Sequence, residues 1–335
     1  MVVPVVWSLA QQYPHVRITV LSRGFARPLF EHLAPNVGFM EADVKHEYHG
    51  IKGLNALYRR LVAKQFTAIA DLHNVLRSDF LRIRFNMGHH KVAHVNKHRK
   101  ERRHLTATVN KQLTPLPSSF HNYADVFARL GYPVELTFRS IFPEGGGDLS
   151  LLPTGLLTPS IQHPTPLIGI APFAAHKGKV YPPRLMQQVI EQLTAHHPDA
   201  RIFLFGRGQQ EDELFPLWCN QYSQCCQVST YLSSLEQELV LMSHLDVMLS
   251  MDSANMHLAS LVATPVVSVW GATHPYAGFM GWNQNPENVI QIPLECRPCS
   301  IFGQKACLRG DYACMNRIAP ETIVEQIEKN LKPKA

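Results

Sequence analysis

The stretch Asp246–Pro275 constrains the fold of this chain more than any other. An apolar run, Val247–Met251, comes first, and four polar or small residues follow it. A short helical pattern then ends at Thr264-Pro265, and Val266–Trp270 reads as a second buried strand that ends at Gly271. A strand, a turn, a helix and a strand in this order are typical of a parallel sheet with crossover helices.

Function is expected at the turn of this unit. The side-chain oxygen of Asp252 or Ser253 can cap the helix that follows. The first turn of that helix presents free N–H groups and a positive dipole end at the carboxyl edge of the sheet, where anions are bound. A plain helix cap with no ligand is the alternative, and the turn by itself does not decide between them.

Composition narrows the class of protein. A length of 335 residues favours about two domains, and 45% hydrophobic with 17% charged residues is ordinary for a globular protein. No apolar run approaches the roughly 20 residues of a membrane span, and the first residues lack the features of a signal peptide. We therefore expect a cytoplasmic protein with mostly reduced cysteines. The net charge of +6 favours an acidic partner: nucleic acid, an anionic membrane surface or a phosphorylated substrate.

Helical and strand patterns alternate along both halves of the chain. The first half predicts helices at 4–12, 25–33, 54–66 and 120–130, with strands at 16–21, 37–42 and 67–72. Ser140–Pro166 loses this periodicity and is rich in proline and glycine, which is typical of a linker. The second half predicts strands at 167–171, 201–205, 228, 247–251 and 266–270, with helices around 185–193, 235–245 and 320–331. The sequence thus predicts two α/β domains.

A resemblance to a known family adds to this pattern. The string Asp-Ser-x-x-x-His-Leu-Ala from Asp252, the Thr-Pro strand and Gly-Ala-Thr-x-Pro from Gly271 resemble the C-terminal signature of glycosyltransferase family 9, the ADP-heptose:lipopolysaccharide heptosyltransferases. The resemblance implies the GT-B architecture, in which two Rossmann-like, doubly wound parallel-sheet domains face each other across a cleft. The expected parts are an acceptor-binding domain, a linker, a nucleotide-sugar-binding domain and a C-terminal helix that packs back on the first domain, with the ranges 1–145, 146–166, 167–318 and 319–335.

The implied reaction is the inverting transfer of heptose from ADP-heptose to the lipopolysaccharide inner core, at the cytoplasmic face of the membrane and without a metal cofactor. The helix after Asp252 and the lysine of Lys179-Val-Tyr-Pro, which matches a family motif, would neutralise the departing diphosphate. Lys179 and Asp252 are the predicted catalytic residues, with Asp252 holding sugar hydroxyls or the loop. The predicted donor-binding residues are Lys177, Lys179, Gly206, Glu211, Asp252, Ser253, Ala254, Asn255, His257 and Thr273.

Two of these assignments have competing readings. Glu211 stands one residue beyond the position at which the family's acidic residue contacts the ribose, and Gln210 occupies the matching offset. His257 lies inside the short helix, where a structural role competes with ligand binding.

The beginning of the chain departs from the family pattern. In the family, a first strand and a Gly-Asp loop precede the helix that matches Val3–Ala10, and the loop aspartate is the expected general base. We expect that strand to be central in the sheet, and its loss to leave unpaired backbone groups and impair the chain. The alternatives to a heptosyltransferase are therefore a non-catalytic paralogue that binds anionic glycan, or another nucleotide-sugar transferase or epimerase of the same architecture.

The basic stretch Arg82–Lys111 suggests where an acceptor binds. By itself such a charge run is typical of a solvated loop. The resemblance places the lipopolysaccharide acceptor, with its carboxylates and phosphates, in this half of the chain. The predicted acceptor-binding residues are His73, Arg77, Lys97, Arg99, Arg102 and Arg103. Nucleic acid is the weaker alternative, because aromatic residues are not interleaved with these charges.

Four cysteines near the C-terminus leave two hypotheses open. Cys296, Cys299, Cys307 and Cys314 have a spacing that suits a structural zinc ion. A set of packed free thiols is the alternative.

Overall fold

The computed structural model describes residues 1–157 and 165–331, and the chain divides into two compact units. Unit 1 comprises Met1–Arg99 and Pro117–Arg139, and unit 2 comprises Lys100–Leu116 and the chain from Ser140 onward. The predicted first domain of residues 1–145 thus differs from unit 1 mainly by the segment 100–116. Residues 158–164 of the predicted linker and 332–335 of the predicted last segment lie outside the described residues.

Unit 2 is built on a parallel sheet of six strands in the order β10-β9-β8-β5-β6-β7. The strand bounds are β5 Leu167–Ala171, β6 Arg201–Leu204, β7 Cys225–Gln227, β8 Val247–Met251, β9 Val266–Val269 and β10 Val289–Ile290. From β5 the chain runs outward through β6 and β7, then returns to β8 and runs outward the other way. The predicted doubly wound sheet is therefore confirmed, and its topological switch point lies between β5 and β8.

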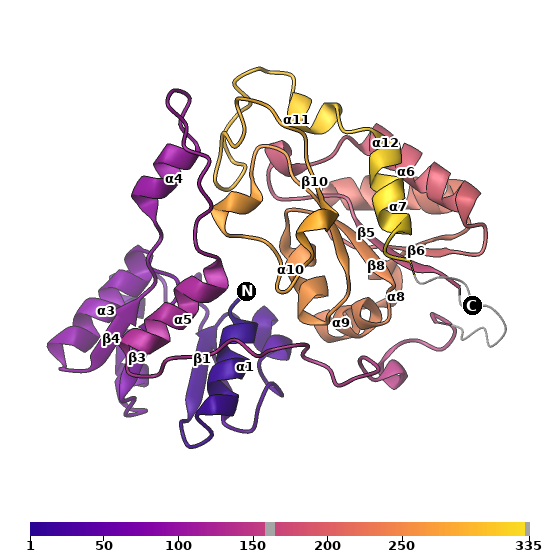
Figure 1. The fold of residues 1–335 in the computed structure, drawn as a ribbon. Coiled ribbons are helices and arrows are strands. Elements are labelled where there is room, and N and C mark those ends of the chain that lie inside the picture. The colour runs from indigo at the N-terminus through magenta and orange to yellow at the C-terminus, as the bar shows by residue number, and fades with distance from the viewer. Residues whose placement is uncertain (158–164, 332–335) are drawn as a thin grey trace. The chain divides into compact units, whose positions relative to one another are not determined.

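The helices of unit 2 cover both faces of this sheet, with α6, α7 and α12 on one face and α9 and α10 on the other (Figure 1). Their bounds are α6 Pro183–His196, α7 Gln209–Gln221, α8 Val228–Tyr231, α9 Leu235–Ser243, α10 Ala254–Leu261, α11 Ala313–Asn316 and α12 Pro320–Glu328. Short 3₁₀ turns connect them at η2 Leu149–Leu151, η3 Lys177–Lys179, η4 Pro275–Ala277 and η5 Pro286–Asn288. Ser234 caps α9, since its side chain accepts a hydrogen bond from the Gln237 N–H.

The C-terminal helix α12 packs into the core of unit 2. Ile323, Val324 and Ile327 of α12 belong to the same apolar core as α6 and the strands of unit 2. Their spacing puts them on one face of the helix, and burial of that face against α6 accounts for its position. The structure thus assigns this helix to unit 2, and its packing on the first domain stays a prediction.

Unit 1 contains two separate pairs of parallel strands. β1 (Ile18–Ser22) pairs with β2 (Val37–Glu41), and β3 (Ala68–Asp71) pairs with β4 (Lys91–His94), with no ladder between the pairs. The helical elements are α1 Val3–Gln12, η1 Gly24–Leu29, α2 Gly50–Val62, α3 Leu76–Met87 and α5 Ser119–Arg129. The predicted α/β character of this half is confirmed. The expectation that a central strand is missing stays a prediction.

Three local predictions are corrected by the structure. The stretch 82–111 is not a simple loop, since it holds the end of α3, β4 and α4 (Arg99–Leu105), anchored by the buried Phe85, Ala93 and Leu105. The predicted helix at 25–33 is a 3₁₀ helix with Pro28 inside it, because proline cannot supply the N–H that an α-helix needs. Val228 starts α8, and the strand lies before it. Among the described residues, no helix is long and apolar enough to cross a bilayer.

Candidate functional site

The switch point of the unit 2 sheet brings two charged residues together. Asp252 directly follows β8 and is 4% exposed, and Lys179 is the last residue of η3, in the loop that follows β5. Lys179 Nζ lies 3.0 Å from Asp252 Oδ2, and the Thr273 hydroxyl donates to the same oxygen over 2.8 Å. Three residues that the sequence predicted from separate motifs therefore form one cluster, at the edge where α/β proteins bind ligands.

The N-terminus of α10 opens beside this cluster. Ser253 is the N-cap residue in an extended conformation, but its side chain makes no capping hydrogen bond. Its hydroxyl lies instead 3.3 Å from that of Ser250, while Asp252 binds Lys179 and Thr273. The predicted capping by Asp252 or Ser253 is therefore wrong. The first amides of this helix, from Ala254 and Asn255, have no side-chain cap. Their N–H groups point out of the N-terminal end of the helix, where an anion can accept hydrogen bonds from them.

Close contacts between glycine-containing loops position Lys179. The Ala272 N–H donates to the Gly178 carbonyl over 2.8 Å, and a Cβ added to Gly178 would lie 2.8 Å from the Ala272 Cβ. A Cβ added to Gly303 would lie 2.5 Å from Cγ of Lys179. A side chain at Gly178 would collide with Ala272, and one at Gly303 would collide with Lys179. Because both positions are glycine, the loops can approach each other and hold Lys179 toward Asp252.

A buried arginine supports the loop that carries Thr273, and the sequence analysis missed it. Arg297 is 4% exposed, and its guanidinium donates to the carbonyls of Gly271 (2.5 Å), Trp270 (3.0 Å) and Thr273 (3.0 Å). It also donates to the Ile292 carbonyl and the Gln291 side chain. The sequence signal was an arginine between Cys296 and Cys299, which drew attention only to the spacing of the thiols.

The other predicted donor-binding residues lie outside the cluster of Lys179, Asp252 and Thr273, and each has its own contacts. Gly206 follows β6 with a φ of +150°, and the Glu211 side chain folds back so that a Cβ on Gly206 would lie 2.8 Å from its Cγ. Lys177 lies over the Tyr312 ring, with 5.0 Å between Nζ and the ring centroid. Burial, reinforced by the positive charge of Lys179, lowers the pKa of His257 to about 3, so its ring is neutral.

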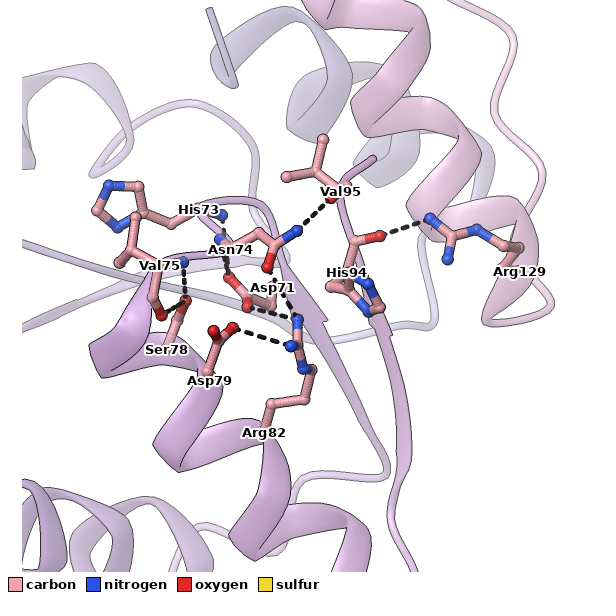
Figure 2. Close-up of polar contacts among 10 residues, drawn as sticks. All are labelled: Asp71, His73, Asn74, Val75, Ser78, Asp79, Arg82, His94, Val95 and Arg129. Atoms are coloured by element: carbon pink, nitrogen blue, oxygen red, sulfur yellow. Dashed lines mark hydrogen bonds and ion pairs between the residues drawn. The ribbon is translucent and has the colours of Figure 1, made fainter. Parts of the chain in front are cut away.

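In unit 1 a polar network shapes the turn between β3 and α3 (Figure 2). Asp71 is buried at the end of β3 and accepts hydrogen bonds from the N–H groups of His73 (3.0 Å) and Asn74 (2.8 Å). Arg82 approaches Asp71 Oδ2 at 3.4 Å and the Asn74 side chain at 3.2 Å. The Asn74 amide in turn donates to the Val95 carbonyl over 2.8 Å. Contacts with Asp71, Arg82 and the Val95 carbonyl thus hold the turn that carries His73.

The six predicted acceptor residues do not all lie in the same unit of the structure. In unit 1, burial lowers the pKa of His73, and the charges of Lys97 and Arg77 act in the same direction. Arg99 is exposed at the start of α4. Arg102 belongs to unit 2, where its guanidinium stacks on Phe279 (5.1 Å) and Phe302 (5.7 Å), and Arg103 lies in the same segment. Of the six, Arg77 and Lys97 are the two whose charges act on His73.

The four C-terminal cysteines are free thiols that line one small cavity with Arg297 and Arg309. Burial raises the pKa of the Cys314 thiol to about 11, and that of Cys299 is also raised. Within residues 1–157 and 165–331, no group of three or more histidine, cysteine or acidic side chains has a geometry that could hold a metal ion. The zinc hypothesis stays a prediction.

The chain is similar in sequence to known glycosyltransferases. A family model described as glycosyltransferase family 9 (heptosyltransferase) matches residues 54–306. The lipooligosaccharide heptosyltransferase 2 of Campylobacter jejuni is 27% identical over 141 residues, which are 39% of this chain and 41% of that protein. The chain therefore matches about two fifths of the length of this curated relative.

Solved structures resemble the whole described fold. The Escherichia coli heptosyltransferase WaaC with ADP, and the same enzyme with ADP-2-deoxy-2-fluoro heptose, each give a TM-score of 0.63 at 17% identity, covering 98% of this chain and 94% of theirs. A family 9 glycosyltransferase from Veillonella parvula gives 0.67 at 16% identity, covering 98% and 92%. At this identity the likeness shows the fold, and that fold is GT-B.

Proposed function

The chain belongs to glycosyltransferase family 9, and on that premise we propose that it transfers a heptose from an ADP-heptose to the inner core of a lipopolysaccharide. The acceptor oxygen forms a bond to the anomeric carbon of the donor as the bond from that carbon to the ADP phosphate oxygen breaks, and the hydroxyl proton passes to water. Because this is one displacement, the anomeric configuration inverts. The proposed setting is the cytoplasmic face of the membrane, where the enzyme contacts the surface that carries its acceptor.

The single observation that carries this proposal is the Lys179–Asp252 pair at the uncapped N-terminus of α10. A diphosphate leaving group gains negative charge in the transition state, and fixed donors and cations aimed at it lower the barrier. The amides of Ala254 and Asn255 and the Lys179 ammonium supply such groups from two loops at one sheet edge. We propose that they neutralise the diphosphate without a metal ion, while Asp252 orients Lys179 and contacts sugar hydroxyls.

The remaining predicted residues take supporting roles in this proposal. Glu211, folded over Gly206 at the neighbouring strand end, would accept hydrogen bonds from the donor ribose. Thr273 would donate to a phosphate oxygen, exchanging its present bond to Asp252. In unit 1, Arg77 and Lys97, whose charges act on His73, would pair with carboxylates or phosphates of the acceptor.

Release of ADP from ADP-heptose by the purified chain, with inner-core lipopolysaccharide as acceptor and a chelator present, tests the proposal. We expect turnover, and an inverted anomeric configuration of the product in NMR spectra. Lys179→Met should raise the donor KM and lower kcat, whereas the exposed Lys329→Met should leave both unchanged. Binding of the acceptor without any ADP release would instead favour a non-catalytic glycan-binding role.

A further inference from the structure

Helix α3 of unit 1 has three distinct faces. One face packs inward, since Phe85 is buried and Leu81 packs against the same core cluster. A second face carries Ser78, Asp79 and Arg82, which hold the β3–α3 turn (Figure 2). These two faces fix the rotation of the helix about its axis, so the direction of its third face is also set.

The third face is apolar and faces solvent. Leu76, Ile83 and Met87 are 88%, 58% and 72% exposed. Their spacing of seven and four residues places them on one side of an α-helix, along about 16 Å of its length. Single exposed apolar residues are ordinary on protein surfaces, but a helix that is apolar on its outer as well as its inner face marks a site of interaction.

The charges beside this stripe are positive and lack carboxylate partners. Arg77 and Arg84 are exposed on α3, and neither forms an ion pair with any residue that the structure describes. Arg84 lies over the Tyr58 ring at 4.7 Å, which holds its guanidinium near the helix surface. The acidic residue of the helix, Asp79, is paired with Arg82 at 2.8 Å and so adds no net negative charge.

We propose that this outer face of α3, formed by Leu76, Ile83 and Met87 with Arg84, docks on an anionic membrane surface. The apolar side chains enter the boundary between headgroups and acyl chains, and Arg84 pairs with a lipid phosphate. The contact is peripheral, because the helix has 12 residues and lies along the surface. The inference rests on the proposed function only in that a lipid-linked acceptor requires the enzyme at a membrane.

Charge complementarity favours lipid over a second copy of the chain. The chain carries a net charge of +6, so two copies that met through this cationic face would repel each other. An anionic lipid surface attracts each nearby arginine by about 1 kcal/mol, or about fivefold in affinity.

Flotation of the purified full chain with phosphatidylcholine vesicles, with and without phosphatidylglycerol, tests the proposal. We expect binding to the anionic vesicles that weakens as salt is added. The triple variant Leu76→Gln, Ile83→Gln, Met87→Gln should bind at least about tenfold more weakly. The matched control Leu217→Gln changes a leucine that is 62% exposed on α7 in unit 2, and it should bind as the wild type does.

The charge contribution is tested separately. Arg84→Gln should lower binding about fivefold on anionic vesicles and leave any binding to neutral vesicles unchanged. Arg17→Gln, which removes another exposed arginine of unit 1, is the control. Unchanged binding of the triple variant would overturn the proposal, as would a wild-type dimer in analytical ultracentrifugation that the triple variant loses.

ADP release with a deacylated, soluble acceptor separates this inference from the proposed function. The triple variant should keep the wild-type rate there and lose activity only with membrane-embedded acceptor. A wild-type chain that binds vesicles through α3 but never releases ADP would refute the proposed function alone. A chain that turns over but ignores anionic vesicles would refute the membrane inference alone.

Discussion

Lys179 Nζ and Asp252 Oδ2 lie 3.0 Å apart at the carboxyl ends of two adjacent strands, β5 and β8. The pair is mostly buried, with the Asp252 side chain 5% exposed. Strand pairing at the switch point brings the two loops together, so this contact depends on the doubly wound topology. A diphosphate at the tip of α10 would meet a lysine that is already oriented.

Coupling between these two residues should be measurable. Lys179→Met leaves the Asp252 carboxylate buried without its cation, and we expect a loss of about 3 kcal/mol in the free energy of unfolding. Asp252→Asn should cost less, because the amide oxygen still accepts from Thr273. Urea unfolding of both single variants and the double variant measures the coupling. Strictly additive effects would show that the pair contributes nothing to stability.

Gly303 should be required for the position of Lys179. In Gly303→Ala the new Cβ would lie 2.5 Å from Lys179 Cγ, so the lysine must move, and we expect a clear drop in kcat for ADP release. Gly310→Ala is the matched control, since its φ of +77° resembles the +82° of Gly303 but its Cβ would meet nothing within 4 Å. Equal losses in the two variants would assign the effect to backbone strain alone.

Arg297 should contribute to stability far more than an exposed arginine. Arg297→Met leaves the carbonyls of Trp270, Gly271 and Thr273 buried without their donor, and we expect a loss of about 3 kcal/mol in the free energy of unfolding. Arg309→Met removes an exposed ion pair with Asp311 and should cost far less, because solvent screens that pair. Denaturant titrations of both variants give the comparison, and similar costs would contradict the role assigned to Arg297.

His274 should make stability depend on pH. Its Nδ1 accepts the Tyr276 N–H over 3.1 Å, and burial, with the charge of Arg297, lowers its pKa from 6.5 to about 4. The unfolded chain takes up this proton near pH 6.5 and the folded chain only near pH 4. Stability contributed by the neutral ring is therefore complete above pH 6.5 and lost as the pH falls toward 4.

The variant His274→Asn isolates this effect. Asparagine keeps an oxygen that can accept the Tyr276 N–H but does not titrate. The difference in unfolding free energy between wild type and variant should shrink or reverse between pH 6.5 and 4. A constant difference across that interval would show that His274 does not titrate on unfolding.

Local patterns predicted most of the regular structure of unit 2. The ranges of β5 and β8 were predicted to the residue, because each is a short apolar run that the sheet buries on both faces. The misses have physical causes. The strand β4 and the helix α4 lie in a stretch whose charges hide the few buried residues, Ala93 and Leu105. The weak apolar signal there becomes decisive only when tertiary contacts bury those side chains.

The sequence by itself determined the alternation of strands and helices, the family, and the motif residues Lys179, Asp252 and Thr273, because periodicity and motif spacing are properties of neighbouring residues. Only the tertiary structure decided that these three meet, that Arg297 supports their loop, and that α3 turns an apolar face outward. Contacts between residues distant in sequence follow from how the elements pack. One-dimensional patterns do not contain that packing.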